Sequence, residues 1–422
     1  MKRTMICLLL FMGQTLAQGA GQVVAVRAGH LVDPATASVT DNQLILVKDG
    51  KILAISPAGE IPSDATVVDL SKEWVMPGLV DAHTHITMNL PPNPPGGSLW
   101  ENFLLRESTA LRAARGLHNA QILLNAGFTA VRDVGNAGDF ADTAVRQAIE
   151  NGWFAGPTVV NSGKIIAPFG GQSHGYAPEQ GEFWKYEYLD ADSPEELRKA
   201  IHQDIYYGAT VIKLAADNSP FYYTEEDIRA ACEEAHRAGL AVAVHVYGGQ
   251  AAENVINGGA DSIEHGWNLT DDQLRLMKQK GTFLVGTDFP YRHMVALGAI
   301  EPLNAREISD KILDRLARAH KIGVKMAFGS DVVVDLPGES RADMVFDYLA
   351  VWQQAGVPAP DILQAFTVNG FALLRLDKQR GPIAVGLAAD MIAVPANPLQ
   401  DIQILKKVNF VMKDGKIVRK PD

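Results

Sequence analysis

Between residues 75 and 385 of this 422-residue chain, short apolar runs of β-type residues alternate with longer stretches of helical periodicity. Strands that alternate with helices form βαβ units, in which the strands pair in parallel. Eight strands are the number that closes into a (β/α)8 TIM barrel, and the length of the block suits that fold. The predicted strands are 75–82, 129–134, 158–160, 211–214, 241–246, 261–264, 282–285 and 324–328.

The two ends of the chain share a different pattern. Short β-rich runs occur near both termini, and Asp49-Gly50 and Asp414-Gly415 are hairpin turn signals. We therefore predict an α/β protein in which residues 22–73 and 386–422 form one small β-sandwich domain, flanking a barrel at 74–385. The helices of the barrel are predicted at 103–125, 143–151, 194–207, 225–238, 250–257, 271–279 and 305–321.

The first 17 residues have the three parts of a secretory signal peptide. Lys2 and Arg3 precede an apolar run at 5–12, and a small residue, Ala17, ends the segment. The run is too short to span a bilayer, and no later stretch is long and uncharged enough to do so. We therefore predict cleavage near Ala17 and a periplasmic or secreted protein without a membrane span.

The charge of the chain excludes some partners. Loss of Lys2 and Arg3 would change the formal net charge from −11 to −13. An acidic chain without a basic run is a poor candidate for binding nucleic acid or anionic lipid. After cleavage Cys232 is the remaining cysteine, so no internal disulfide can form.

His83 and His85 stand two residues apart where the first predicted strand ends. Residues i and i+2 of a strand point the same way, so both imidazoles can aim at one point beyond the strand. Two converging neutral imidazoles suit a metal site, whereas the alternative is two unrelated histidines at a strand edge.

Four further polar residues lie at or near the ends of other predicted strands. Lys213 interrupts an apolar run, His245 and His265 each close one, and Asp331 follows the last. Singly, each has another explanation: a core histidine, a salt-bridged lysine or a helix-capping aspartate. Together with the first pair they come from one face of the predicted barrel, where the active sites of such barrels lie.

These residues carry a family resemblance. His83-Thr84-His85, Lys213, His245, His265 and Asp331, in this order, resemble the binuclear metal pattern of the amidohydrolase superfamily. Three segments resemble its imidazolonepropionase-like branch, which includes dipeptidases, carboxypeptidase-like enzymes and hydrolases of N-acyl amino acids such as ochratoxin A. The segments are Gly78-Leu79-Val80-Asp81, Val131-Arg132-Asp133-Val134-Gly135 and Ser262-Ile263-Glu264-His265-Gly266.

The resemblance implies a homo-oligomer with two divalent ions per chain, of which Zn²⁺ is the typical one. It implies that Lys213 is carboxylated on its amine and bridges the ions, that His83, His85 and Asp331 hold one ion, and that His245 and His265 hold the other. It further implies that a hydroxide shared by the ions attacks the substrate, with Asp331 as general base and then acid.

Other candidate residues have weaker signals. His174, in a glycine-rich loop, and Tyr247, two residues after His245, are candidates to polarise the substrate carbonyl; many relatives have histidine at the Tyr247 position. Arg132, Arg292 and His293 are candidates to pair with a substrate carboxylate. The alternatives are a solvated loop histidine, structural ion pairs and solvated charges.

We therefore expect a binuclear hydrolase that cleaves the amide bond of N-acyl amino acids or dipeptides with an apolar or aromatic C-terminal residue. One alternative is a mononuclear cyclic-amide hydrolase or deaminase of the imidazolonepropionase type, against which Lys213 argues because one ion needs no bridge. A lactonase or phosphotriesterase-like hydrolase remains open, and six intact ligand positions argue against a non-catalytic binding protein.

Overall fold

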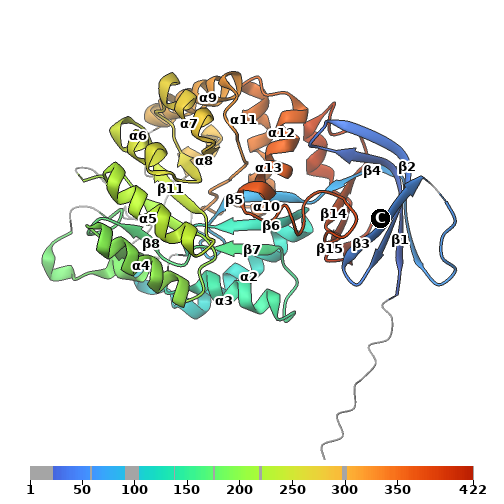
Figure 1. The fold of residues 1–422 in the computed structure, drawn as a ribbon, viewed down its shortest axis with the longest axis horizontal. Coiled ribbons are helices and arrows are strands. Elements are labelled where there is room, and N and C mark those ends of the chain that lie inside the picture. Colours follow the sequence, from blue (N-terminus) through green and yellow to red (C-terminus); the bar gives the residue numbers. More distant parts are fainter. Residues whose placement is uncertain are drawn as a thin grey trace, which may run out of the picture.

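The computed structural model describes residues 22–57, 59–90, 104–136, 138–173, 176–217, 221–296 and 302–421. They form a large body of helices around strands and a smaller sheet at one side of it (Figure 1). The predicted signal peptide, residues 1–17, lies outside the described residues, so its cleavage stays a prediction. No helix in the described part of the chain is long and apolar enough to cross a membrane.

The smaller part, called here the terminal sheet, joins both ends of the chain. Its seven strands have the order β16-β15-β14-β4-β1-β2-β3, in which β1 and β4 are parallel and the other neighbours are antiparallel. A two-layered sandwich stays a prediction. The strands are β1 (Val24–Asp33), β2 (Ser38–Lys48), β3 (Lys51–Pro57), β4 (Thr66–Pro77), β14 (Met391–Val394), β15 (Phe410–Lys413) and β16 (Lys416–Arg419).

Two hairpin turns of the terminal sheet form as their Asp-Gly pairs predict. The φ angles are 50° at Asp49, 79° at Gly50, 48° at Asp414 and 72° at Gly415. Two successive left-handed residues are the geometry of a type I′ turn, which glycine and aspartate tolerate best. The turns also abut, because a Cβ atom on Gly415 would lie 2.9 Å from the Gly50 Cα.

The larger body contains parallel strands in two sheets, with the orders β5-β6-β7 and β13-β12-β11-β10-β8-β9. This confirms the predicted α/β class and is a TIM-barrel-like arrangement. The strands are β5 (Leu79–Thr84), β6 (Phe128–Asp133), β7 (Thr158–Asn161), β8 (Ile165–Ala167), β9 (Tyr188–Asp190), β10 (Ile212–Ala215), β11 (Val242–Val246), β12 (Ser262–His265) and β13 (Phe283–Val285).

The predicted strand 75–82 is wrong in its bounds, because it is two strands. Residues up to Pro77 end β4 of the terminal sheet, and β5 begins after Gly78. A Cβ atom on Gly78 would lie 2.1 Å from the Thr129 Oγ1 atom, so only glycine fits this crossing. The chain therefore passes directly from one sheet into the other.

The predicted strand 158–160 is confirmed as β7, which pairs with β6, whereas β8, which pairs with β10, was not predicted. One further predicted strand is irregular. The segment 324–328 makes a single bridge, between Met326 and Leu284, and is not a regular strand. It still lies between β13 and β5, because the Ala327 N–H donates to the Leu284 carbonyl (3.1 Å) and the Ala82 N–H donates to the Phe328 carbonyl (2.8 Å).

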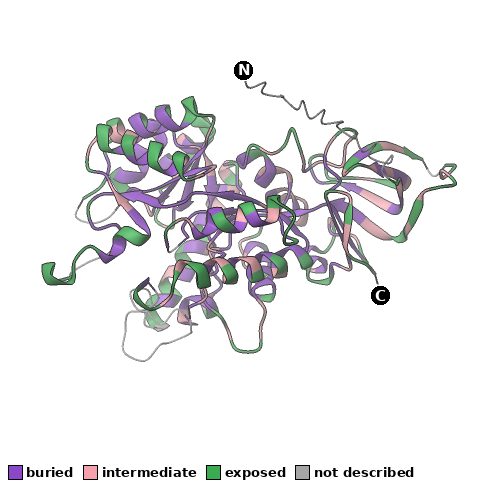
Figure 2. Ribbon diagram, turned by 90° about the horizontal axis from the view of Figure 1, so that it is seen from below, coloured by how far each residue is buried: buried purple, intermediate pink, exposed green. Residues whose placement is uncertain are grey.

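The helices surround these strands, with exposed outer faces and buried inner faces (Figure 2). Several start at side-chain caps: Ser108, Ser193 and Thr224 each accept a backbone N–H of the first turn. The helices are α2 (Thr109–Asn125), α3 (Ala141–Glu150), α4 (Pro194–Tyr206), α5 (Glu225–Arg237), α6 (Gly249–Gly258), α7 (Asp271–Lys280), α8 (Tyr291–Ala296), α9 (Pro302–Ile322), α10 (Arg341–Phe346), α11 (Tyr348–Gln354), α12 (Ala359–Ala365) and α13 (Val368–Leu373), with 3₁₀ turns η1 (Pro178–Gln180), η2 (Phe183–Tyr186) and η3 (Ile402–Lys407).

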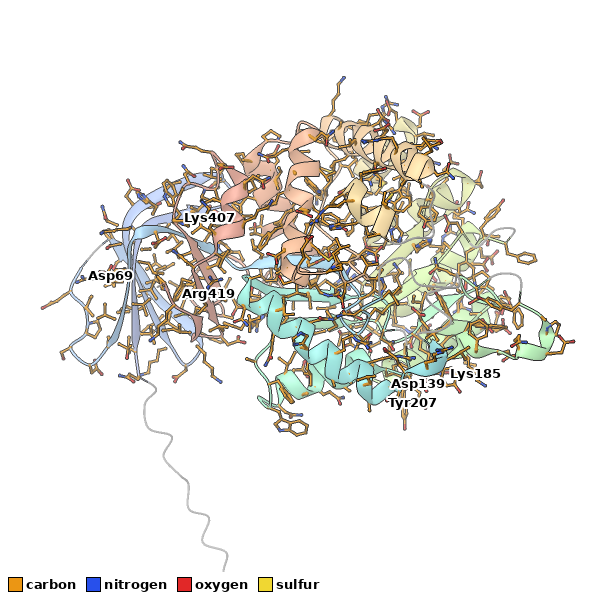
Figure 3. All side chains as sticks on the ribbon, turned by 180° about the vertical axis from the view of Figure 1, so that it is seen from behind. Asp69, Asp139, Lys185, Tyr207, Lys407 and Arg419 are labelled. Carbon is orange, nitrogen blue, oxygen red and sulfur yellow. The ribbon has the colours of Figure 1, made fainter. Side chains whose placement is uncertain are left out.

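The carboxyl ends of the parallel strands face away from the terminal sheet. Asp139 follows β6 and Lys185 follows β8, and Figure 3 shows both at the opposite end of the molecule from Asp69 of β4. Because parallel strands end at one edge, side chains at these ends gather there.

Candidate active site

β5 carries the first two candidate ligands, and hydrogen bonds orient both rings. The Nδ1–H of His83 donates to Glu264 (2.7 Å), and the Nδ1–H of His85 donates to the Gly135 carbonyl (2.7 Å). These bonds leave the Nε2 atoms free, and they lie 3.7 Å and 3.1 Å, respectively, from Oδ1 of Asp331. A ring fixed through one nitrogen with the other turned toward a shared point is typical of metal ligands.

Asp331 is held against β5 by the main chain. Its N–H donates to the His83 carbonyl (2.7 Å), and its φ of 53° turns the chain sharply. Asp81 supports this turn, because its Oδ1 accepts the N–H groups of Ser330 (2.9 Å) and His83 (3.2 Å). A left-handed backbone at a non-glycine residue is uncommon and often marks a functional site.

β11 and β12 bring in two more imidazoles. The ring centroids of His245 and His265 are 4.4 Å apart. His265 has a φ of 70°, and its Nδ1 lies 2.8 Å from Thr287 Oγ1 and 3.7 Å from Asp331 Oδ2. One ligand atom from each of His83, His265 and Asp331 lies within 4.8 Å of the other two. The strand ends therefore place imidazoles on both sides of the Asp331 carboxylate.

Lys213 lies in β10, between Ile165 of β8 and Ala243 of β11. Its Nζ atom is buried and has no hydrogen-bond partner among the residues that the structure describes. Burial lowers the pKa of the amine to about 8, although nearby Glu264 acts in the opposite direction. An unpartnered buried ammonium is unfavourable, which is why burial lowers this pKa.

Burial also keeps three of the imidazoles neutral. It lowers the pKa of His83 to about 4 and that of His245 to about 3, and it lowers the pKa of His265 well below its usual range. At neutral pH these rings therefore keep the lone pairs that a metal ion needs. At His85 burial acts the same way, but Asp331 outweighs it and raises the pKa.

The donor set fits divalent ions of the zinc type. Neutral imidazoles and a carboxylate are common zinc ligands, and an unpartnered lysine amine beside them fits the carbamate that the sequence resemblance implies. The six predicted ligands do gather at one edge. The prediction assigns His83 and His265 to different ions, but both lie in one group with Asp331. This geometry therefore does not show how the ligands are divided between two ions.

Arg132 already has partners within the chain. It is buried, and its guanidinium donates to Ala82 (2.5 Å), Ser262 (3.0 Å) and Glu264 (2.7 Å). The structure thus favours the ion-pair alternative. Arg132 fixes Glu264, which in turn fixes His83.

Arg292 and His293 of α8 are likewise engaged. Arg292 donates to Glu339 (2.6 Å) and Asp347 (2.6 Å), and the Nε2 atom of His293 lies 3.2 Å from Asp347. Two carboxylates contact Arg292 and one contacts His293, as the ion-pair alternative expects, and their binding of a substrate carboxylate stays a prediction. His174 lies outside the described residues, and its role stays a prediction.

Tyr247 does lie beside the candidate ligands. Its ring centroid is 4.8 Å from that of His245, 5.6 Å from that of His265 and 4.8 Å from that of Trp267. Burial raises the pKa of its phenol, so the hydroxyl stays protonated at neutral pH and can donate a hydrogen bond. Whether it contacts a substrate carbonyl stays a prediction.

Three neighbours of the site were missed from the sequence. Glu264 could have been found by the argument used for Lys213, because it too is a charged residue in an apolar strand. Asp217 follows β10, and its Oδ1 lies 3.4 Å from His245 Nε2. Gln172, whose Nε2 lies 3.1 Å from the same atom, belongs to a loop and carries no sequence signal of its own.

Buried imidazoles and a carboxylate at the strand ends of a TIM-barrel-like fold define a candidate metal site of the kind that hydrolytic enzymes use. The sequence pattern of the Amidohydrolase family matches residues 74–418, so the chain belongs to that family. Its relatives place it among hydrolases that act on carbon–nitrogen bonds.

Three of these relatives show the range of similarity. Ochratoxinase of Aspergillus niger is 28% identical over 447 residues, covering 95% of this chain and 87% of the relative. Imidazolonepropionase of a Geobacillus species is 26% identical over 431 residues, covering 90% and 91%. A prolidase structure in complex with N-methylphosphonate-L-proline has a TM-score of 0.81 and 26% identity, covering 94% of this chain and 100% of that chain.

Proposed function

We propose that this protein is a binuclear metal-dependent amidohydrolase that cleaves N-acyl amino acids or dipeptides. The observation that carries the proposal is Lys213, a buried amine without a hydrogen-bond partner in the described structure, among imidazole and carboxylate groups. A mononuclear site would give this lysine no role, whereas a bridge between two ions needs an anion at this place.

In this proposal His83, His85 and Asp331 hold one ion, and His245 and His265 hold the other. The neutral amine of Lys213 forms a bond to the carbon of CO₂, one carbonyl π bond breaks, and a proton leaves, which gives an anionic carbamate. The lowered pKa of Lys213 favours this reaction, because only the neutral amine is a nucleophile. Bound divalent ions would lower the pKa of the water they share and polarise the scissile carbonyl.

Asp331 is proposed as the proton carrier. Its pKa is lowered: burial raises it, but His83 and His85 outweigh that effect, so the carboxylate is ionised at neutral pH. It can accept the proton of the attacking water and then donate it to the leaving amine. The backbone of Asp331 is fixed, so its carboxylate stays in place and both proton transfers need little movement.

The substrate class rests on the relatives and on the aromatic side of the site. Ochratoxinase and a prolidase are among the similar proteins, and both names point to amide bonds. Tyr247 and Trp267 lie beside the imidazoles and suit an apolar or aromatic C-terminal residue. The substrate carboxylate, its contact and the carbonyl contact of Tyr247 or His174 belong to this proposal.

Further parts of the proposal concern the whole chain. We propose that segment 324–328 closes an eight-stranded barrel, supported by its hydrogen bonds to Leu284 and Ala82. Export after cleavage near Ala17, Zn²⁺ as the metal, a two-layered terminal domain and assembly into a homo-oligomer are also proposed.

Elemental analysis of protein purified with zinc and bicarbonate, together with hydrolysis of N-acyl and dipeptide substrates, tests this function. We expect two ions per chain in the wild type and loss of both metal and activity in Lys213→Ala. Lys164→Ala is the matched control: Lys164 is also buried, but it pairs with Asp139 (2.8 Å) and should leave metal content unchanged. One ion per chain with full activity would favour the mononuclear alternative.

A further inference from the structure

One carboxylate oxygen of Asp217 accepts a hydrogen bond, and the other has no hydrogen-bond donor among the described residues. Its Oδ2 atom accepts the backbone N–H of Tyr247 (2.6 Å), which ties the segment after β10 to the end of β11. Its Oδ1 atom lies 3.4 Å from His245 Nε2 and has no hydrogen-bond partner in the described part of the chain. The side chain is only 15% exposed. Such an oxygen is costly to bury unless a cation or donor arrives.

The position of this oxygen is fixed rather than incidental. The bond to the Tyr247 N–H sets the orientation of the carboxylate, so Oδ1 is held toward His245. The Nε2 atom of Gln172 lies 3.1 Å from the same imidazole nitrogen, and its Oε1 accepts the Tyr188 hydroxyl (2.9 Å). Two polar groups therefore lie close to the nitrogen through which His245 would hold an ion in the proposed function.

Glu264 and Asp331 are already engaged. Both oxygens of Glu264 are bonded, to His83 and to Arg132, and both oxygens of Asp331 face imidazoles. The proposed mechanism assigns no task to Asp217. A further carboxylate beside His245, with one oxygen that no described donor bonds, suits a positively charged group on the substrate.

We propose that Asp217 binds the free α-ammonium group of a dipeptide, so that the enzyme prefers dipeptides to N-acyl amino acids. This inference rests on the proposed function. In a dipeptide the ammonium nitrogen is two bonds from the scissile carbonyl carbon, so a carbonyl beside His245 places that nitrogen within reach of an acceptor next to the same ring. An N-acyl substrate brings no cation and leaves the Asp217 oxygen unpaired.

The sharpest test uses two substrates that differ only in the ammonium group, Ala-Phe and N-propanoyl-phenylalanine. We expect kcat/KM of the zinc-loaded wild type to be at least about 100-fold higher for Ala-Phe, because a site that hydrogen-bonds a substrate group discriminates strongly against its absence. The preference should fall above pH of about 8, where the α-amino group of the substrate loses its proton.

Asp217→Asn keeps the shape of the side chain and an oxygen for the Tyr247 N–H but removes the charge. Its preference for Ala-Phe should fall to within about threefold of unity through a loss on Ala-Phe, while hydrolysis of N-propanoyl-phenylalanine persists. Asp310→Asn is the control for net charge, because Asp310 is an exposed residue of α9. It should keep the wild-type preference.

The possible outcomes distinguish the role of Asp217 from the proposed amidohydrolase function. Equal hydrolysis of both substrates by the wild type would overturn the role of Asp217 and leave the amidohydrolase function standing. Failure to cleave either substrate would count against the proposed function itself. Loss of an ion from Asp217→Asn by elemental analysis would make Asp217 a metal ligand and overturn the ammonium site.

Discussion

Replacing Arg132 by methionine separates a structural ion pair from a substrate contact. The guanidinium is fully buried, and Arg132→Met removes three hydrogen bonds, one of them to the buried carboxylate of Glu264 at 2.7 Å. Removing one partner of a buried ion pair leaves an uncompensated charge and costs about 3–5 kcal/mol. We therefore expect the free energy of unfolding to fall by about that amount.

The same change should reach the metal site through Glu264. This carboxylate accepts the Nδ1–H of His83, and it loses its cationic anchor in Arg132→Met. Loss of such an orienting partner typically weakens metal binding by about 10–100-fold. A chelator competition titration with zinc measures this change, and urea denaturation of the metal-free protein measures the stability.

Arg292→Met is the matched control, because this arginine is 45% exposed and pairs with Glu339 and Asp347. An exposed ion pair contributes about 1 kcal/mol or less, so this variant should stay near the wild type in stability and metal affinity. A second variant, Arg132→Met with Glu264→Gln, removes both charges and should recover part of the lost stability. The reasoning is refuted if Arg132→Met changes stability by less than about 1 kcal/mol and raises KM alone.

Three further predictions concern the site and the chain. Lys213→Arg should not restore the metal lost in Lys213→Ala, because a guanidinium cannot become the bridging carbamate, whereas added short carboxylic acids should restore some activity; rescue by arginine in a metal assay would contradict this. N-propanoyl-phenylalanine should be cleaved faster than its C-terminal amide, and equal kcat/KM values would show that the free carboxylate is not recognised. N-terminal sequencing of the native protein should begin near Gln18, and an intact Met1 would exclude cleavage.

Much of the fold could be predicted because its signals are local. The helix α5 (Glu225–Arg237) begins at the residue its pattern indicates, since Thr224 and Asp227 form a capping box next to an amphipathic run. The division of the predicted strand at Gly78 could not be predicted, because it depends on distant partners: β4 pairs with β1 and β14, whereas β5 pairs with β6. The irregular segment 324–328 has the composition of a strand, and only its neighbours limit its pairing to a few bonds.

The candidate ligands were predictable for a related reason. His83, His245 and His265 are polar residues in apolar strands, and parallel topology brings strand ends to one edge. Pair partners were not predictable, because they lie far apart along the chain. Arg132 meets Glu264 132 residues away, and Arg292 meets Asp347 55 residues away.

Three buried basic residues show what the burial of a basic side chain can and cannot predict about its partner. Arg132, Lys164 and Lys213 are each buried in the larger body, and each predicts that a partner must exist. For Arg132 the partner is Glu264, and for Lys164 it is Asp139. For Lys213 the described side chains supply no hydrogen bond to Nζ. The partners of two of these residues are thus side chains of the protein itself, and the missing partner of Lys213 is the observation on which the proposed bridge between two ions rests.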